Sequence, residues 1–507
     1  MTGVKSVIDG AVARYPAAIA FVAGLLYPLA FALFDWSLLA VVSLAILFIV
    51  IDGRTPKLAA RCGFLFGFGA FLAGVYWLYI SLRVFGGAPL LLSIPLMLAV
   101  IAVMALYSAM FAWLSNTLRP QPGLFRWLLV LPAAWTFFDW LRGWLFSGFP
   151  WLATGYSQID MPLAGLAPVL GVHGVGLAVA LSAGVLVVLL RLGPRQRLTA
   201  VVVLTILWIG GGSLREVAWT QAAGAATTVT LLQGNVEQDL KWEPEQFDPI
   251  LERYVAMTAE YKDSDLIIWP EAAIPGFLQE AAVARFVEDL RREVDDNDYE
   301  LLLGVLDFNL RTKDAYNAAI GIDGELQFYR KRHLVPFGEY FPVPAFVRSW
   351  MRLMSLPHSD FQRGDDVQPL IELSGQRIAT MICYEVVFGA EQIAYLPAAT
   401  LLVNISNDAW FGDSIAPHQH LQIAQMRALE TGRYLLRATN TGITAAIDPK
   451  GVILDRLPQF EIGALTVDLY PYTGATPYVS VGNWPVIGGA SVVLLFAAWP
   501  VLRHRLS

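Results

Sequence analysis

The uneven distribution of charge along the chain constrains its fold more than any other feature. Residues 1–215 contain long apolar runs with few ionisable side chains, whereas residues 227–470 hold most of the Asp, Glu, Lys and Arg. Over the whole chain 15% of residues are charged and 56% are hydrophobic, against roughly 25% charged in soluble domains. This division predicts a membrane part followed by a polar domain.

Eight apolar stretches approach the length of about 20 residues that a helix needs to cross a bilayer. They occupy residues 14–34, 36–51, 63–82, 89–114, 127–146, 168–191, 198–214 and 484–502. The fifth stretch contains Asp139 and Arg142, and charges at bilayer depth are costly and often functional. Two roles remain open for this couple: pairing with each other, or facing an entrance for lipid headgroups.

Basic residues fall in alternate connections between these stretches, and such residues favour cytoplasmic loops. They are Lys5 and Arg14, then Arg54, Lys57 and Arg61, then Arg119 and Arg126, then Arg191, Arg195 and Arg197, and finally Arg503 and Arg505. Both ends of the chain are therefore predicted inside. We expect membrane helices 1–7 in residues 1–214, a domain on the outer side in residues 215–483, and helix 8 with a cytoplasmic tail in residues 484–507.

The polar region shows the rhythm of an α/β domain, in which short β-rich runs alternate with polar helices. Strands are predicted in 227–236, 266–271, 299–308, 377–385 and 399–408, hairpins in 316–331 and 443–457, and helices in 244–262, 280–294 and 417–436. The net charge of −7 lies mainly in this region, and no basic run suits a phosphate backbone. We therefore expect no nucleic-acid partner.

Three of the predicted strands end in groups able to perform acyl transfer. Glu271, Lys331 and Cys383 each follow an apolar run, and functional groups of α/β domains gather where strands end. A carboxylate base can generate a thiolate nucleophile, and an ammonium stabilises an oxyanion. Cys62 lies at the inner end of the third stretch, so it cannot pair with Cys383. The alternative for Cys383 is a buried core cysteine.

Three motifs in a fixed order carry a resemblance to a known superfamily. WPEAAIP at 269–275, YRKRHLVPFGE at 329–339 and ICYE at 382–385 resemble the signatures of the nitrilase (carbon–nitrogen hydrolase) superfamily. The resemblance implies a four-layer α-β-β-α sandwich beside the polytopic helical part. It also implies that Glu271 is the general base, that Lys331 stabilises the tetrahedral intermediate and that Cys383 is the nucleophile.

The variants of these motifs and their fusion to membrane helices resemble more narrowly the apolipoprotein N-acyltransferase family. RGWLFSGFPWLATGY at 142–156 and QGNVEQDLKW at 233–242 are similar to further signatures of that family, so the resemblance covers nearly the whole chain. By position in the motifs it implies supporting roles for Glu339, Tyr384 and Glu385. It implies that Trp242 contacts the substrate.

The resemblance implies an acyltransferase of the bacterial cytoplasmic (inner) membrane, with a periplasmic catalytic domain. A phospholipid would donate an acyl chain through a cysteine thioester, and the N-terminal amine of a diacylglyceryl-cysteine apolipoprotein would accept it. We expect a monomer that needs no cofactor. The alternatives are a membrane-tethered amidase, in which water resolves the acyl-enzyme, and a transporter or lipid-binding protein with an inactive domain.

The remaining candidates are weaker. His418 and His420 form an H-x-H pair, but no further cluster supplies the other ligands of a metal site, so we expect none. His333 or His358 would pair with Cys383 only if the fold placed one beside it. Residues 340–357 have apolar side chains at helical spacing, which suits either an interfacial helix or a buried one.

Overall fold

The computed structural model describes residues 10–118, 123–340 and 361–506. His358 and all but the first residue of the predicted 340–357 helix lie outside these residues. The chain folds as two compact units. Residues 1–217 and 480–507 form a helical unit, and Ala218–Val479 form an α/β unit.

The helical unit contains a helix in each of the eight predicted stretches. The helices are α2 (Pro16–Leu26), α3 (Leu38–Ile51), α4 (Pro56–Gly74), α6 (Leu90–Leu118), α7 (Leu131–Arg142), α8 (Ala167–Arg191), α9 (Pro194–Arg215) and α16 (Trp484–Leu506). By length and composition, four helices in the described part of the chain suit a membrane span: Pro56–Gly74, Leu90–Leu118, Pro162–Arg191 and Pro194–Arg215. Three further apolar helices are shorter. The number of spans stays a prediction.

Small residues allow the helices of this unit to approach closely. A Cβ atom added at Gly63 of α4 would lie 2.3 Å from the Ser108 carbonyl oxygen of α6. One added at Gly24 of α2 would lie 2.1 Å from the Phe66 carbonyl oxygen of α4. Such contacts are typical of helix packing in membranes, where close backbone approach replaces the hydrophobic effect between helices.

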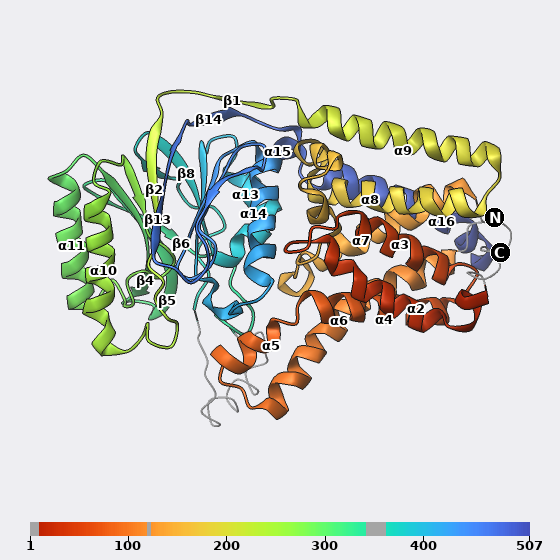
Figure 1. Cartoon of the computed structure of the whole chain (residues 1–507), viewed down its shortest axis with the longest axis horizontal. Helices are drawn as coiled ribbons and strands as arrows, with labels where there is room; N and C mark the ends of the chain where they lie inside the picture. The colour runs from red at the N-terminus through yellow and green to blue at the C-terminus, as the bar shows by residue number, and fades with distance from the viewer. Residues whose placement is uncertain (1–9, 119–122, 341–360, 507) are drawn as a thin grey trace. The chain divides into compact units, whose positions relative to one another are not determined.

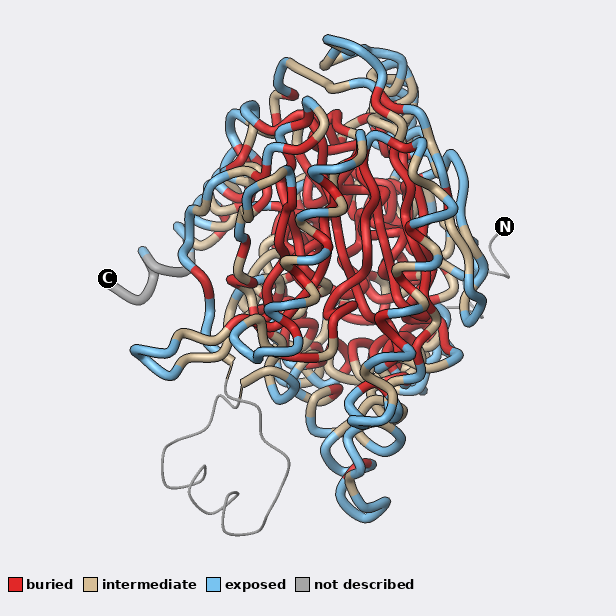
Figure 2. Tube along the Cα trace, turned by 90° about the vertical axis from the view of Figure 1, so that its left-hand side faces the viewer, coloured by how far each residue is buried: buried red, intermediate tan, exposed pale blue. Residues whose placement is uncertain are grey.

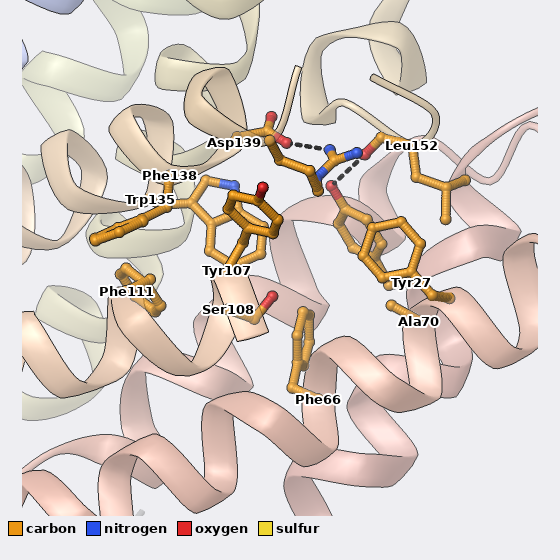
Figure 3. A pocket seen from close by; sticks show the side chains of 12 residues that line it. Tyr27, Phe66, Ala70, Tyr107, Ser108, Phe111, Trp135, Phe138, Asp139 and Leu152 are labelled. Carbon is orange, nitrogen blue, oxygen red and sulfur yellow. Dashed lines mark hydrogen bonds and ion pairs between the residues drawn. The ribbon is translucent and has the colours of Figure 1, made fainter. Parts of the chain in front are cut away.

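The charged couple of α7 forms an internal ion pair beside a narrow aromatic cavity (Figure 3). The Arg142 guanidinium donates to Asp139 and, over 2.6 Å, to the Trp151 carbonyl oxygen. The second Asp139 oxygen accepts from the Thr154 amide at 3.0 Å. Of the two roles left open by the sequence, the structure shows mutual pairing, and the pair fastens the loop after α7 to the helix itself.

The α/β unit contains two stacked six-stranded sheets (Figure 1). The first has the order β13-β2-β3-β4-β5-β6, formed by Gly463–Leu469, Thr227–Gln233, Leu266–Ile268, Glu300–Asn309, Asp314–Ile322 and Leu326–Arg330. The second has the order β12-β11-β10-β9-β8-β7, formed by Ile453–Arg456, Ala445–Ile447, Leu435–Thr439, Leu401–Ser406, Gln376–Ile382 and Ile371–Leu373. β2 contacts β10 and β5 contacts β8, so the sheets pack face to face.

Helices cover the outer face of each sheet. α10 (Phe247–Glu260) and α11 (Ala281–Asp295) lie side by side on the first sheet and share its apolar core (Figure 1). α14 (Ala416–Thr431) packs on β10 and β11 of the second sheet. The central strands of both sheets are almost entirely buried (Figure 2), and so is α14. The predicted α-β-β-α sandwich is therefore confirmed.

Both predicted hairpins are confirmed, because β5 pairs antiparallel with β6 and β11 with β12. The predicted helix 417–436 is wrong at its end. α14 stops at Thr431 because Gly432 adopts a left-handed conformation with φ of 62°. The chain then forms β10 parallel to β9. The chain enters and leaves the unit through a two-stranded ribbon, in which β1 (Thr220–Ala222) pairs with β14 (Tyr472–Gly474).

Candidate active site

The three residues predicted to react lie just beyond strand ends of the two sheets. Glu271 follows β3, Lys331 follows β6, and Cys383 follows β8. The Lys331 ammonium lies 3.6 Å from a Glu271 oxygen, and both side chains lie close enough to Cys383 to influence its thiol. The structure therefore brings together a thiol, a carboxylate and an ammonium within the α/β unit.

Glu271 is held in place by close backbone packing and by two hydrogen bonds. A Cβ atom at Gly304 of β4 would lie 2.7 Å from the Glu271 Cα, so the turn needs glycine beneath it. One carboxylate oxygen accepts from Asn317 Nδ2 at 2.7 Å and the other from the Asn407 amide at 2.9 Å. These bonds fix both carboxylate oxygens of a residue that is only 8% exposed.

Lys331 is fully enclosed and paired with acids. Its Nζ donates to Glu339 Oε1 at 2.8 Å, and its amide donates to the Asn317 carbonyl oxygen at 2.8 Å. Burial alone would lower the pKa of Lys331, but the carboxylates of Glu339 and Glu271 outweigh burial and raise it. The ammonium thus stays charged at neutral pH. Glu339, predicted as a supporting residue, is a direct partner of Lys331.

Cys383 begins a sharp turn, Cys383–Val387, with its backbone in the left-handed region at φ of 52°. Non-glycine residues held in this region are strained and cluster at functional sites. Burial and the nearby Glu271 carboxylate raise the pKa of the Cys383 thiol to about 12, against the opposing influence of Lys331. The resting side chain is therefore a thiol, which needs a proton acceptor before it can attack.

Glu385 joins the lysine segment to the cysteine turn. Its buried carboxylate accepts from the Ile382 amide at 2.7 Å, the Arg332 amide at 2.8 Å and the Tyr329 hydroxyl at 2.9 Å. Burial raises the pKa of Glu385, although these backbone donors favour its charged form. Glu385 therefore orients two strand ends. Tyr384 is mostly buried and packs edge-on against Phe388.

Trp242 lies beside the site and is 49% exposed. The preceding residue, Lys241, donates from Nζ to the Glu271 carbonyl oxygen at 3.2 Å, with Nζ 5.9 Å from the Trp242 ring centre. Burial lowers the pKa of Lys241 to about 8, against the attraction of Glu271. A second, desolvated ammonium therefore adjoins Glu271, and an exposed indole adjoins that ammonium.

Three histidines of the α/β unit have partners that the structure describes. The His333 ring stacks on Phe388, and its Nδ1 lies 2.8 Å from Glu391 Oε1. His420 is buried with Nδ1 3.1 Å from Asp408 Oδ1, and His418 Nε2 lies 3.2 Å from Gln459 Nε2. Among the described residues no group of three or more His, Cys, Asp or Glu is arranged to hold a metal ion.

Sequence reasoning missed three residues of the site: Lys241, Asn317 and Asn407. Asn317 bridges Glu271 and Glu339, at 2.7 and 3.0 Å. Its signal was a single amide side chain inside the apolar strand β5, where an unpaired polar group would be costly. Lys241 stands within the QGNVEQDLKW motif, and Asn407 follows directly after β9.

Comparison with known proteins first defines the class. The carbon-nitrogen hydrolase family model matches residues 209–478, and the model of the apolipoprotein N-acyltransferase N-terminal domain matches residues 23–185. Named relatives match nearly the full length. The apolipoprotein N-acyltransferase of Methylococcus capsulatus is 45% identical over 93% of this chain and 93% of its own. The Vibrio parahaemolyticus enzyme is 41% identical over 96% of this chain and 97% of its own. The Azotobacter vinelandii enzyme is 44% identical over 96% of this chain and 95% of its own.

The α/β unit is thus a domain of the nitrilase class joined to a polytopic helical unit. The chain belongs to the apolipoprotein N-acyltransferase family. Its apolar helices, together with this membership, make it a multi-pass membrane protein.

Proposed function

We propose that the chain transfers a fatty acyl chain from a phospholipid to the N-terminal amine of a diacylglyceryl-cysteine apolipoprotein. The observation that carries the proposal is the meeting of Cys383, Glu271 and Lys331 in a membrane protein of this family. Membrane helices suit a lipid substrate better than a small soluble amide, so the amidase alternative is not favoured.

In the first step Glu271 takes the proton of the Cys383 thiol, and the thiolate attacks an ester carbonyl of the phospholipid. The Lys331 ammonium stabilises the resulting oxyanion. The tetrahedral intermediate expels the lysophospholipid alkoxide, which receives the proton from Glu271. The products are a thioester on Cys383 and a free lysophospholipid.

In the second step the α-amine of the apolipoprotein attacks the thioester. Glu271 accepts a proton from the amine, and the intermediate collapses to an amide with release of the thiolate. The thiolate takes this proton from Glu271, which restores the thiol, the carboxylate and thus the starting enzyme. Glu339 keeps Lys331 in place, Glu385 and Tyr384 support the cysteine turn, and Trp242 contacts the lipid or lipopeptide at the edge of the site.

We further propose that the α/β unit faces the periplasm from the cytoplasmic (inner) membrane and that the protein acts as a monomer. The alternation of basic connections supports this orientation. Acceptors that have already crossed the membrane would then meet the site without recrossing it.

The test is acylation of the purified protein by phospholipid alone. Mass spectrometry should detect one acyl mass on the peptide that contains Cys383. Neutral hydroxylamine should remove the mark, and a diacylated lipopeptide should discharge it as an N-acylated product. Glu271→Gln should slow acylation about a hundred- to ten-thousand-fold, because this is the usual contribution of general-base assistance.

Cys62→Ala is the matched control, because Cys62 is the other cysteine and lies buried in the helical unit; it should behave like the parent. Transfer by Cys383→Ala near the parent rate would show that the amine attacks the phospholipid directly. Release of free fatty acid in place of the N-acylated lipopeptide would identify an amidase.

A further inference from the structure

A single hydroxyl connects the nucleophile to a buried carboxylate. Ser406, the last residue of β9, donates from Oγ to Asp408 Oδ1 over 3.0 Å. β9 pairs parallel with β8, with Ile405 opposite Ile382, so Ser406 lies beside Cys383 and its hydroxyl is near enough to the thiol to favour the thiolate. Ser406 is fully buried and Asp408 is 2% exposed. Ser406 therefore approaches the cysteine from a strand of the second sheet, whereas Glu271 and Lys331 follow strands of the first sheet.

Asp408 is held in its charged form. Arg437 Nη2 donates to Asp408 Oδ2 at 2.6 Å, and His420 Nδ1 lies 3.1 Å from Oδ1. Burial alone would raise the pKa of Asp408, but Arg437 and His420 outweigh burial and lower it. At neutral pH this side chain is a carboxylate, and a carboxylate only accepts hydrogen bonds.

The charge of Asp408 fixes the direction of the neighbouring hydrogen bonds. A serine hydroxyl has one proton to donate and lone pairs that accept. Because that proton points to Asp408, the hydroxyl can only accept from the Cys383 S–H group in the resting enzyme. A thiolate has no proton and only accepts, so the hydroxyl must turn toward the sulfur to keep the contact. Asp408 then retains its bond from Arg437.

We propose that Ser406 is a positioning residue for the nucleophile, whose hydroxyl accepts from the thiol at rest and donates to the sulfur once Glu271 has taken the proton. The inference rests on the proposed function in that Cys383 is the nucleophile. One proton moves, from the Cys383 sulfur to a Glu271 oxygen. Ser406 keeps its own proton and changes only the acceptor, so it is not a base.

The arrangement predicts opposite effects for two substitutions. Four groups face the thiol: Glu271 and Asp408 disfavour the thiolate by charge, whereas Lys331 and the Ser406 hydroxyl favour it. Ser406→Ala removes a donor to the thiolate and should raise the pKa of the thiol. Asp408→Asn removes a repelling charge and frees the hydroxyl, so it should lower that pKa.

Alkylation of Cys383 by iodoacetamide measures this property without any acyl donor. The full-length protein in detergent would carry Cys62→Ala, which leaves one thiol. The alkylated peptide would be quantified from pH 6 to pH 9.5. Below its pKa the thiolate fraction falls about tenfold for each unit by which the pKa rises. We expect Ser406→Ala to be alkylated about tenfold more slowly at each pH, and Ser406→Thr, which keeps the hydroxyl, to approach the parent.

Ser264→Ala is the matched control, because Ser264 is a buried serine of the same unit that bonds Thr230; its alkylation should be unchanged. Parent-like alkylation of a Ser406→Ala protein that melts at the parent temperature would overturn the proposal, as would slower alkylation of Asp408→Asn. Thermal melts show whether each variant folds. If one of Ser406→Ala and Asp408→Asn does not fold, the direction in which the other changes the alkylation rate decides. Alkylation of Cys383 needs no acyl donor, so this experiment gives an answer even if the protein fails to transfer acyl groups.

Discussion

Lys241 links the stability of the α/β unit to pH. Burial lowers the pKa of Lys241 to about 8, whereas an exposed lysine titrates near 10.4. Between these values the unfolded chain binds more protons than the folded one, so stability rises with pH across that window. Below about pH 8 Lys241 is charged in both states, and burying its ammonium then costs the folded state on the order of 3 kcal/mol.

Lys241→Met should therefore raise the melting temperature of the full-length protein at pH 7. It should also remove most of the increase in stability that the parent shows between pH 8 and pH 10. An apolar side chain of similar length needs no desolvation of charge. Lys262→Met is the control, because Lys262 forms a partly exposed ion pair with Glu293, and such pairs contribute little. An unchanged or lower melting temperature for Lys241→Met at pH 7 would contradict the prediction.

At the scale of elements, the Asp139–Arg142 pair fixes the loop that follows α7. Arg142→Ala would leave a buried Asp139 carboxylate without its cation, and breaking one side of a buried pair costs about 3–5 kcal/mol. We expect a lower melting temperature and faster proteolysis within residues 143–153. The double variant Asp139→Ala with Arg142→Ala should lie closer to the parent than either single variant.

Arg363→Ala serves as the comparison for this experiment, since Arg363 pairs with Asp366 at the surface, where the two side chains are 63% and 82% exposed. It should melt like the parent. If the double variant lowers the melting temperature by as much as the two single variants together, the two charges act independently and the prediction is wrong.

Strand ends were predictable because each has a local signal. Glu271, Lys331 and Cys383 all follow apolar runs, and the ordered motifs indicated that the three meet. The partners of these residues were not predictable in the same way. Asn317 and the Asn407 amide reach Glu271 only because β5 and β9 belong to sheets that pack face to face. Likewise, β10 becomes a strand through its pairing with β9, which no local pattern reveals.

For the whole molecule, we predict that the α/β unit lies on the periplasmic side. Single cysteines at the exposed positions Arg195 and Lys450, in a background without Cys62 and Cys383, would be treated with a membrane-impermeant maleimide in intact cells. Lys450→Cys should be labelled at once, and Arg195→Cys only after the cells are opened. The reverse pattern would place the catalytic unit in the cytoplasm.

The ribbon of β1 and β14 makes the catalytic unit a cassette. Its first and last strands are hydrogen-bonded neighbours, with Thr220 opposite Gly474. The unit is therefore inserted into the chain at two points that lie next to each other. Domains with adjacent ends can be inserted into a host without separating the flanking segments. A soluble nitrilase-class domain could therefore have been acquired by a membrane bundle in one insertion, and an engineer could exchange it at the same two strands.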